Sequence, residues 1–132
     1  MEVSVLTPTV GAPALTAAVR SVATQSLPAR HVVVVDGAAH EGAARAAIAA
    51  AEPPADRMPV LVVLPDNTGH DRNNGHRVYR HVAPLLETGF VALLDEDNVL
   101  EPAHLGTLVP IAVRHGAAWS PNSTTRRSLS SS

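Results

Sequence analysis

Four short apolar runs, separated by segments with helical patterns, constrain the fold of this sequence most. The runs are rich in Val and Leu, with little polar alternation, and span residues 3–6, 31–35, 60–64 and 90–94. Such runs are typical of strands buried on both faces of a parallel sheet. The intervening segments are predicted helices, at about 14–25, 41–52, from 74 onward and 102–115. This order predicts an α/β fold, with a mainly parallel sheet of about four strands flanked by helices.

Prolines and a polar tail set the expected boundaries. Pro8 is expected to end the first strand, and Pro102 fits the first position of the last helix. Residues 117–120 are a candidate short final strand. The length of 132 residues fits one domain. We expect that domain over residues 1–120, followed by a Ser-, Thr- and Arg-rich tail at 121–132 that is predicted to be disordered.

Composition excludes several classes of function. The net charge of −2 argues against a nucleic-acid partner or an anionic membrane surface. All ten basic residues are Arg, so a P-loop lysine and a Schiff-base lysine are both excluded. The chain has no Cys, which excludes disulfides and thiol chemistry. No signal peptide is recognisable, and no apolar run reaches the about 18 residues of a membrane span. These features predict a cytoplasmic domain with no membrane span.

An acidic cluster, Asp95-Glu96-Asp97-Asn98, directly follows the last apolar run. Ligands bind at the carboxyl ends of strands in open α/β sheets. Adjacent carboxylates repel one another unless a cation or hydrogen-bond donors compensate, so the cluster suggests a divalent metal. If the extended backbone continues past the strand, Asp95 and Asp97 point the same way and can hold one Mg²⁺ or Mn²⁺. A solvated turn that caps the following helix is the alternative, and it remains open.

A second acid, Asp36, ends the second predicted strand, where it can hydrogen-bond a ribose hydroxyl or a base edge. A turn residue before Gly37 is an equally good interpretation. The dinucleotide-binding version of such a site needs G-x-G-x-x-G after the first strand. Residues 8–13 read P-T-V-G-A-P, with a single glycine, so that version is disfavoured.

The polar loop at residues 67–75 reads N-T-G-H-D-R-N-N-G. Its glycines allow close backbone approach to a ligand, and the guanidinium of Arg72 suits a diphosphate. An ordinary connection with Asn and Gly turns is the alternative. His70, His76 and His81 are not spaced to share one helix face, so surface or capping roles are favoured over metal ligation.

Taken together, these motifs resemble the nucleotide-binding half of family 2 glycosyltransferases, which have the Rossmann-like GT-A fold. The resemblance covers residue 3 to about residue 115, with its motifs in the family's order. They are V-S-V-L-T-P-T at 3–9, S-V-A-T-Q-S-L-P at 21–28, V-V-V-D-G at 33–37, N-x-G at 67–69, R-N-N-G at 72–75 and L-L-D-E-D-N at 93–98, the last matching the D-x-D segment. No single motif is specific, but the ordered set is.

The resemblance implies a domain that binds a nucleotide-diphosphate sugar, with a UDP-sugar expected first, and Mn²⁺ or Mg²⁺. The sugar would be transferred with inversion to an unknown acceptor. The implied nucleotide-binding residues are Pro8, Thr9, Asp36, Asn67, Gly69, Arg72 and Asp95. Asp97 is the implied metal ligand, together with Asp95.

Two departures from the family keep alternatives open. The loop between Gly69 and Arg72 is shorter than in typical members, and nothing in residues 121–132 resembles the acceptor-binding half that supplies the catalytic base. No catalytic residue is therefore assigned. The alternatives are a catalytically incomplete nucleotide-binding module, and an assembly module in which a homo-oligomer or a partner chain supplies the missing half. A nucleotidyltransferase is disfavoured because residues 8–13 lack its glycine-rich basic turn.

Overall fold

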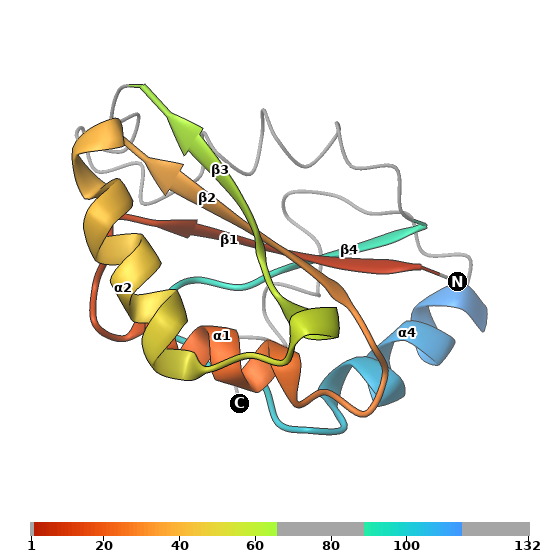
Figure 1. Cartoon of the computed structure of the whole chain (residues 1–132). Helices are drawn as coiled ribbons and strands as arrows, with labels where there is room; N and C mark the ends of the chain where they lie inside the picture. The colour runs from red at the N-terminus through yellow and green to blue at the C-terminus, as the bar shows by residue number, and fades with distance from the viewer. Residues whose placement is uncertain (1, 66–88, 115–132) are drawn as a thin grey trace.

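The computed structural model describes residues 2–65 and 89–114. Their core is a four-stranded, all-parallel sheet of order β3-β2-β1-β4 (Figure 1). Its strands are β1 (Val3–Thr9), β2 (Arg30–Asp36), β3 (Val60–Leu64) and β4 (Phe90–Leu93). The predicted α/β class and the parallel sheet are confirmed.

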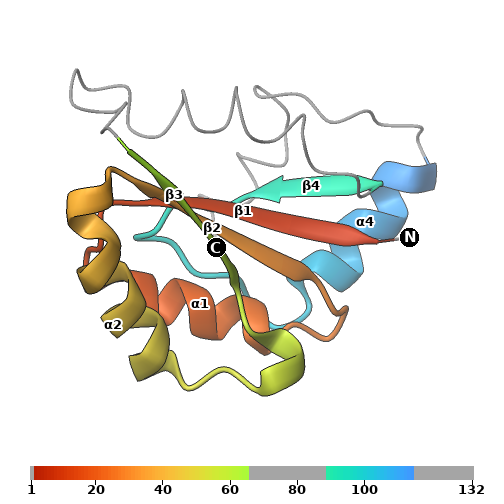
Figure 2. The ribbon, with the colours of Figure 1, turned by 45° about the horizontal axis from the view of Figure 1, so that its top comes forward.

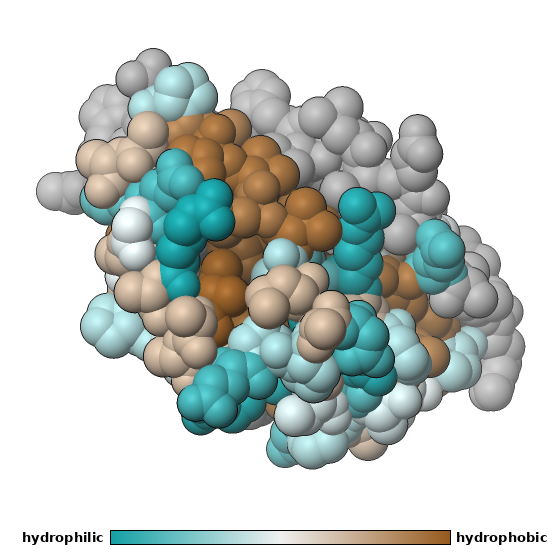
Figure 3. Space-filling model, in the orientation of Figure 1, coloured by the Kyte–Doolittle hydropathy of each residue, from teal (hydrophilic) through white to brown (hydrophobic). Residues whose placement is uncertain are grey.

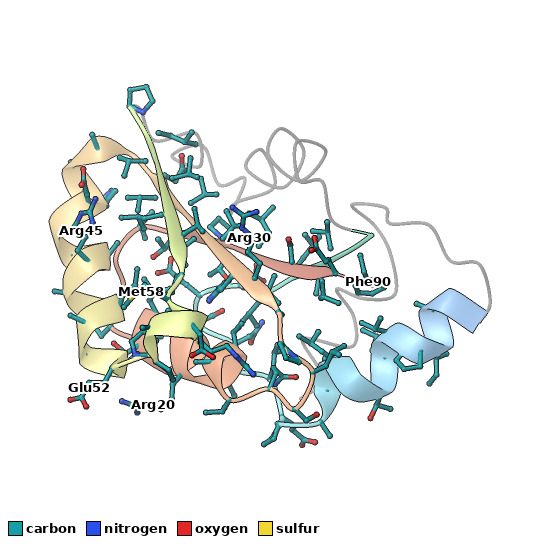
Figure 4. All side chains as sticks on the ribbon, turned by 45° about the vertical axis from the view of Figure 1, so that its right-hand side comes forward. Arg20, Arg30, Arg45, Glu52, Met58 and Phe90 are labelled. Carbon is teal, nitrogen blue, oxygen red and sulfur yellow. The ribbon has the colours of Figure 1, made fainter. Side chains whose placement is uncertain are left out.

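Three described helices pack beneath one face of this sheet, as Figure 2 shows. They are α1 (Leu15–Ala23), α2 (Glu41–Ala51) and α4 (His104–Arg114), and two single 3₁₀ turns, η1 (Ala38–His40) and η2 (Ala55–Arg57), connect the elements. On the outer side of α2, Arg45 donates a 2.8 Å hydrogen bond to Glu41 one turn earlier (Figure 4). None of the helices in the described part of the chain is long and apolar enough to cross a membrane.

Aliphatic side chains fill the core in two clusters. One joins α1 and α2 to the sheet around Val33 and Val35. The other joins α1 and α4 to β1 and β4, with Leu105 and Val109 as the buried residues of α4. Burying one such side chain stabilises the fold by roughly 1.5–3 kcal/mol, so a core of Val, Leu and Ala suffices with almost no aromatic residues.

The first strand is longer than predicted, because Pro8 lies inside it instead of ending it. In a parallel strand, alternate residues direct their N–H and C=O groups to opposite neighbours. The carbonyl of Leu6 accepts a bond from the Leu94 N–H on the β4 side, so Pro8, two residues later, faces that side too. Pairing with β4 ends at Leu6, and the N–H that proline lacks therefore has no ladder partner to lose.

The last helix begins later than predicted. Pro102 precedes α4 by two residues, and its carbonyl accepts a 2.8 Å hydrogen bond from the N–H of Ser26. The predicted helix from residue 74, the strand at 117–120 and the tail at 121–132 lie outside the described residues.

Strand β3 forms the outer edge of the described sheet and exposes apolar side chains. Val60 is 39% exposed and Val62 37%, and Met58, just before the strand, is 54% exposed. Figure 3 shows the resulting brown area over β3.

The strand order reverses at β1. The chain proceeds from β1 to β2 and β3 in one direction and then places β4 on the opposite side of β1. In open α/β sheets, ligands bind outside the carboxyl ends of the strands at this kind of reversal. The loops that follow β1 and β4 are therefore where a ligand site is expected.

Candidate donor site at the carboxyl ends of β1 and β4

The two loops at the reversal are joined by the side chain of Glu96. Its Oε1 accepts a 2.7 Å hydrogen bond from the Thr9 hydroxyl and a 3.1 Å bond from the Ala12 N–H. Its Oε2 accepts a 3.1 Å bond from the Val10 N–H. Three hydrogen-bond donors thus compensate the charge of this carboxylate. The sequence predicted that either such donors or a cation would stabilise the acidic cluster.

The Thr9 hydroxyl has a fixed orientation in this arrangement. It accepts a 2.9 Å hydrogen bond from the Gly11 N–H, so its single proton is directed toward Glu96. Thr9 therefore holds both its own loop and the loop after β4. The N–H groups of Val10 and Ala12 reach the Glu96 carboxylate directly, whereas the N–H of Gly11 between them is bonded to Thr9.

Gly11 allows the loop after β1 to pass close to α2. Its φ of +80° is a backbone conformation that side chains disfavour. A Cβ placed there would lie 2.7 Å from the Cβ of Ala43 and 3.2 Å from the carbonyl oxygen of His40. The single glycine of residues 8–13 thus allows a tight turn and a close approach of this loop to α2. It does not form part of a glycine-rich phosphate loop.

The acidic cluster itself forms a turn. Strand β4 ends at Leu93, and the N–H of Asn98 donates a 3.0 Å bond to the carbonyl of Asp95. The condition for Asp95 and Asp97 to point the same way through strand alternation is therefore not met, because the extended backbone does not continue through the cluster. Asp95 is half-buried and Asp97 is exposed.

Asp97 has no hydrogen-bond or ion-pair partner among residues 2–65 and 89–114. That region also contains no group of three His, Cys, Asp or Glu side chains that could hold a metal. The donor set nevertheless fits a cation of the Mg²⁺ type, which commonly uses one or two carboxylates together with water and substrate phosphates. Asp97 and Asp95 would supply the carboxylates, since Glu96 is committed to the loop after β1.

Asp36 lies at the end of β2, beside Leu64 of β3. Thr9 ends β1, the neighbouring strand on the other side of β2. It is only 3% exposed, and the following Gly37 turns the chain with a φ of +119°. The predicted residues Pro8, Thr9, Asp36 and Asp95 thus share the carboxyl edge of the sheet. The other predicted residues, Asn67, Gly69 and Arg72, lie outside the described residues, as do the three histidines considered as ligands.

Gln25 fixes the segment that follows the acidic turn, a role that sequence reasoning missed. Its buried amide donates to the carbonyls of Ser21, at 3.1 Å, and Glu101, at 2.6 Å. Its Oε1 accepts a 3.0 Å bond from the Leu105 N–H at the beginning of α4. The Gln within S-V-A-T-Q-S-L-P was the available signal, because a polar residue just after an apolar helix face needs buried partners.

His31 is buried in β2, away from the carboxyl edge. Its Nε2 lies 2.8 Å from the Thr7 hydroxyl, and its Nδ1 has no partner in the described part of the chain. Desolvation by burial lowers the pKa of this imidazole to about 3, so His31 is neutral near pH 7. Its burial near the amino end of β2, away from the loops at the carboxyl edge, indicates a structural role.

Comparison with known proteins identifies the fold. No protein-family model and no curated protein matches the sequence. Among solved structures, TarS from S. aureus, a wall teichoic acid glycosyltransferase, matches 88% of the chain. The TM-score is 0.68 at 19% identity for TarS 1–349 and 0.62 at 22% identity for a second TarS structure. The chain shares the fold of this part of TarS.

The likeness is one of fold and covers part of TarS. The chain corresponds to 33% of the TarS 1–349 chain and to 20% of the second TarS chain. The predicted Rossmann-like α/β architecture is thereby confirmed, whereas glycosyltransferase activity, membership of family 2, the donor, the metal and the acceptor stay predictions.

Proposed function

We propose that this chain is the donor-binding part of a family 2-like, inverting glycosyltransferase. It binds a nucleotide-diphosphate sugar, with a UDP-sugar as the first candidate, together with Mn²⁺ or Mg²⁺. Asp97 and Asp95 hold the metal, and Pro8, Thr9 and Asp36 contact the nucleoside. Asn67, Gly69 and Arg72, which lie outside the described residues, are proposed to bind the nucleotide as well, with Arg72 near the ribose or diphosphate.

One observation carries the proposal: an exposed carboxylate, with no partner among the described residues, lies beside the strand-order reversal of a fold shared with TarS. Asp97 lies in a turn, and the preceding residue, Glu96, accepts hydrogen bonds from the loop after β1. A cation there lies where a diphosphate can approach it, while the nucleoside faces the ends of β1 and β2. A bound metal would act as a Lewis acid that offsets the charge developing on the departing nucleoside diphosphate.

Calorimetric titration with UDP, GDP and several UDP-sugars, with and without Mn²⁺, tests the proposal. We expect metal-dependent binding of at least one of them. Asp97→Asn should weaken that binding about tenfold or more, a loss of about 1.4 kcal/mol. Asp56→Asn is the matched control, because Asp56 is an exposed acid in η2, away from the site, and its removal changes the net charge equally.

Absence of binding to every nucleotide, or binding unaffected by Asp97→Asn, would contradict the proposal. Sugar transfer is a separate measurement, since the chain corresponds to a third or less of the TarS chains it matches. The second candidate is a module that binds the donor without catalysing transfer. Transfer of a sugar by the isolated 132-residue chain would exclude that candidate.

A further inference from the structure

We infer that the Thr9–Glu96 hydrogen bond is a positioning contact for the metal, so that Thr9 controls metal affinity without touching the ion. The inference rests on the proposed function of the site. It concerns two named segments: the acidic turn, residues 95–98, and the first loop, residues 9–12. Glu96 extends from the acidic turn, and all three of its hydrogen-bond donors belong to the first loop.

The acidic turn needs such an anchor because strand pairing ends just before it. The last pairing with β1 is Leu6 with Leu93, followed by the bond from the Leu94 N–H to the Leu6 carbonyl. Beyond this point the bond from Asn98 to Asp95 closes the turn on itself and does not attach it to the sheet. The side chain of Glu96 bridges this gap and fixes the residue between the two proposed metal ligands.

The hydrogen bonds to the Glu96 carboxylate attach the acidic turn strongly to the first loop. Hydrogen bonds to a charged acceptor are about twice as strong as those between neutral groups. The donors are themselves held in place, because Gly11 donates to the Thr9 hydroxyl and the N–H of Leu15 donates to the carbonyl of Ala12 as α1 begins. The position of the acidic turn is therefore defined before any ion arrives, and less conformational entropy is lost when the metal binds.

The decisive variant is Thr9→Val, which removes one donor to Glu96 together with the acceptor of the Gly11 N–H, keeps nearly the same shape and changes no charge. Mn²⁺ affinity is measured by electron paramagnetic resonance without nucleotide, so a contact between Thr9 and a nucleoside cannot contribute. We expect Thr9→Val to weaken Mn²⁺ binding about fivefold or more, in the usual range for coupling between sites. Thr9→Ser keeps the hydroxyl and should restore the affinity.

Thr16→Val is the matched control for general destabilisation. The Thr16 hydroxyl donates a 2.8 Å bond to the Ala47 carbonyl, between α1 and α2 and away from the acidic turn. This variant should lower stability while leaving Mn²⁺ affinity within twofold of wild type. If Thr9→Val does not fold, Glu96→Gln replaces it. The N–H₂ group of a glutamine side chain cannot accept hydrogen bonds, so it would lose either the bond from Val10 or those from Thr9 and Ala12. Glu101→Gln then controls for the lost charge, because Glu101 is exposed.

The outcomes separate this inference from the proposed function. A wild-type chain that binds neither Mn²⁺ nor any nucleotide contradicts the proposed function itself. A wild-type chain that binds UDP with Mn²⁺ but not Mn²⁺ alone overturns the inference, since an acidic turn held in advance should bind the ion unaided. Equal Mn²⁺ affinities of wild type and Thr9→Val, or equal losses in Thr9→Val and Thr16→Val, also overturn it.

Discussion

The hydroxyl of Thr9 and the carboxylate of Glu96, 87 residues apart in the sequence, are joined by a 2.7 Å hydrogen bond. The bond connects the loops after β1 and β4, at the point where the strand order reverses. The bond also distinguishes Glu96 from the two aspartates of the cluster. Glu96 stabilises the loop, and the proposed metal ligands Asp95 and Asp97 flank it.

Gly11→Ala should destabilise the chain by about 2 kcal/mol or more, because a side chain is strained at this positive φ and its Cβ would lie 2.7 Å from that of Ala43. Gly42→Ala is the matched control. Nothing lies within 4 Å of a Cβ at Gly42, in the first turn of α2, so this change should be neutral or stabilising by up to about 1 kcal/mol. Urea unfolding measures both, and equal effects would contradict the close approach at Gly11.

Gln25→Leu should cost about 2 kcal/mol, because it leaves the Leu105 N–H and the Glu101 carbonyl without their partner. The exposed neighbour Thr24 provides the control, and Thr24→Ala should change the free energy of unfolding by at most about 0.5 kcal/mol. Thermal unfolding followed by circular dichroism measures both. A Gln25→Leu variant as stable as wild type would show that α4 does not depend on this amide.

Stability should fall in acid because of His31. Its pKa is about 3 in the folded chain, against 6.5 for an ordinary histidine, owing to desolvation. Between these two values the unfolded chain binds more protons, so stability increases with pH there and is lost as the pH falls from about 6.5 toward 3.

His31→Gln removes this titration and keeps a polar group near Thr7. Urea unfolding at several pH values should show a smaller loss of stability for this variant than for wild type, by up to about 1.4 kcal/mol per pH unit. His104, whose pKa burial also lowers, is present in both proteins and does not affect the difference between them. Parallel stability–pH curves would contradict a neutral, buried His31.

UDP and Mn²⁺ together should raise the unfolding temperature, because ligands that bind the folded state alone stabilise it. At a ligand concentration of about 100 times Kd the gain is about 2.7 kcal/mol. Chelation of Mn²⁺ by EDTA should remove most of the gain, whereas EDTA added to the chain without Mn²⁺ and without nucleotide should change little. A shift that survives chelation would point to metal-independent binding.

Much of the fold could be predicted from the sequence, because its signals are local. The valine run of β2 and the helix periodicity of α1 each define an element through neighbouring residues alone. The prediction that Pro8 ends β1 was wrong because the outcome depends on another strand, since β4 pairing ends beside Leu6. The shared direction of Asp95 and Asp97 depended on extended backbone, which the turn that begins at Asp95 interrupts.

The sequence by itself determined the strands, the order of the motifs and the presence of carboxylates after β4, since these follow from residue type and spacing. Only the tertiary structure decided which of these carboxylates is bonded to the loop after β1. Glu96 is bonded to donors more than 80 residues away, and those donors converge only after β1 and β4 have paired. The 2.7 Å hydrogen bond between Thr9 and Glu96 depends on the relative positions of two strands, and local sequence patterns do not contain that information.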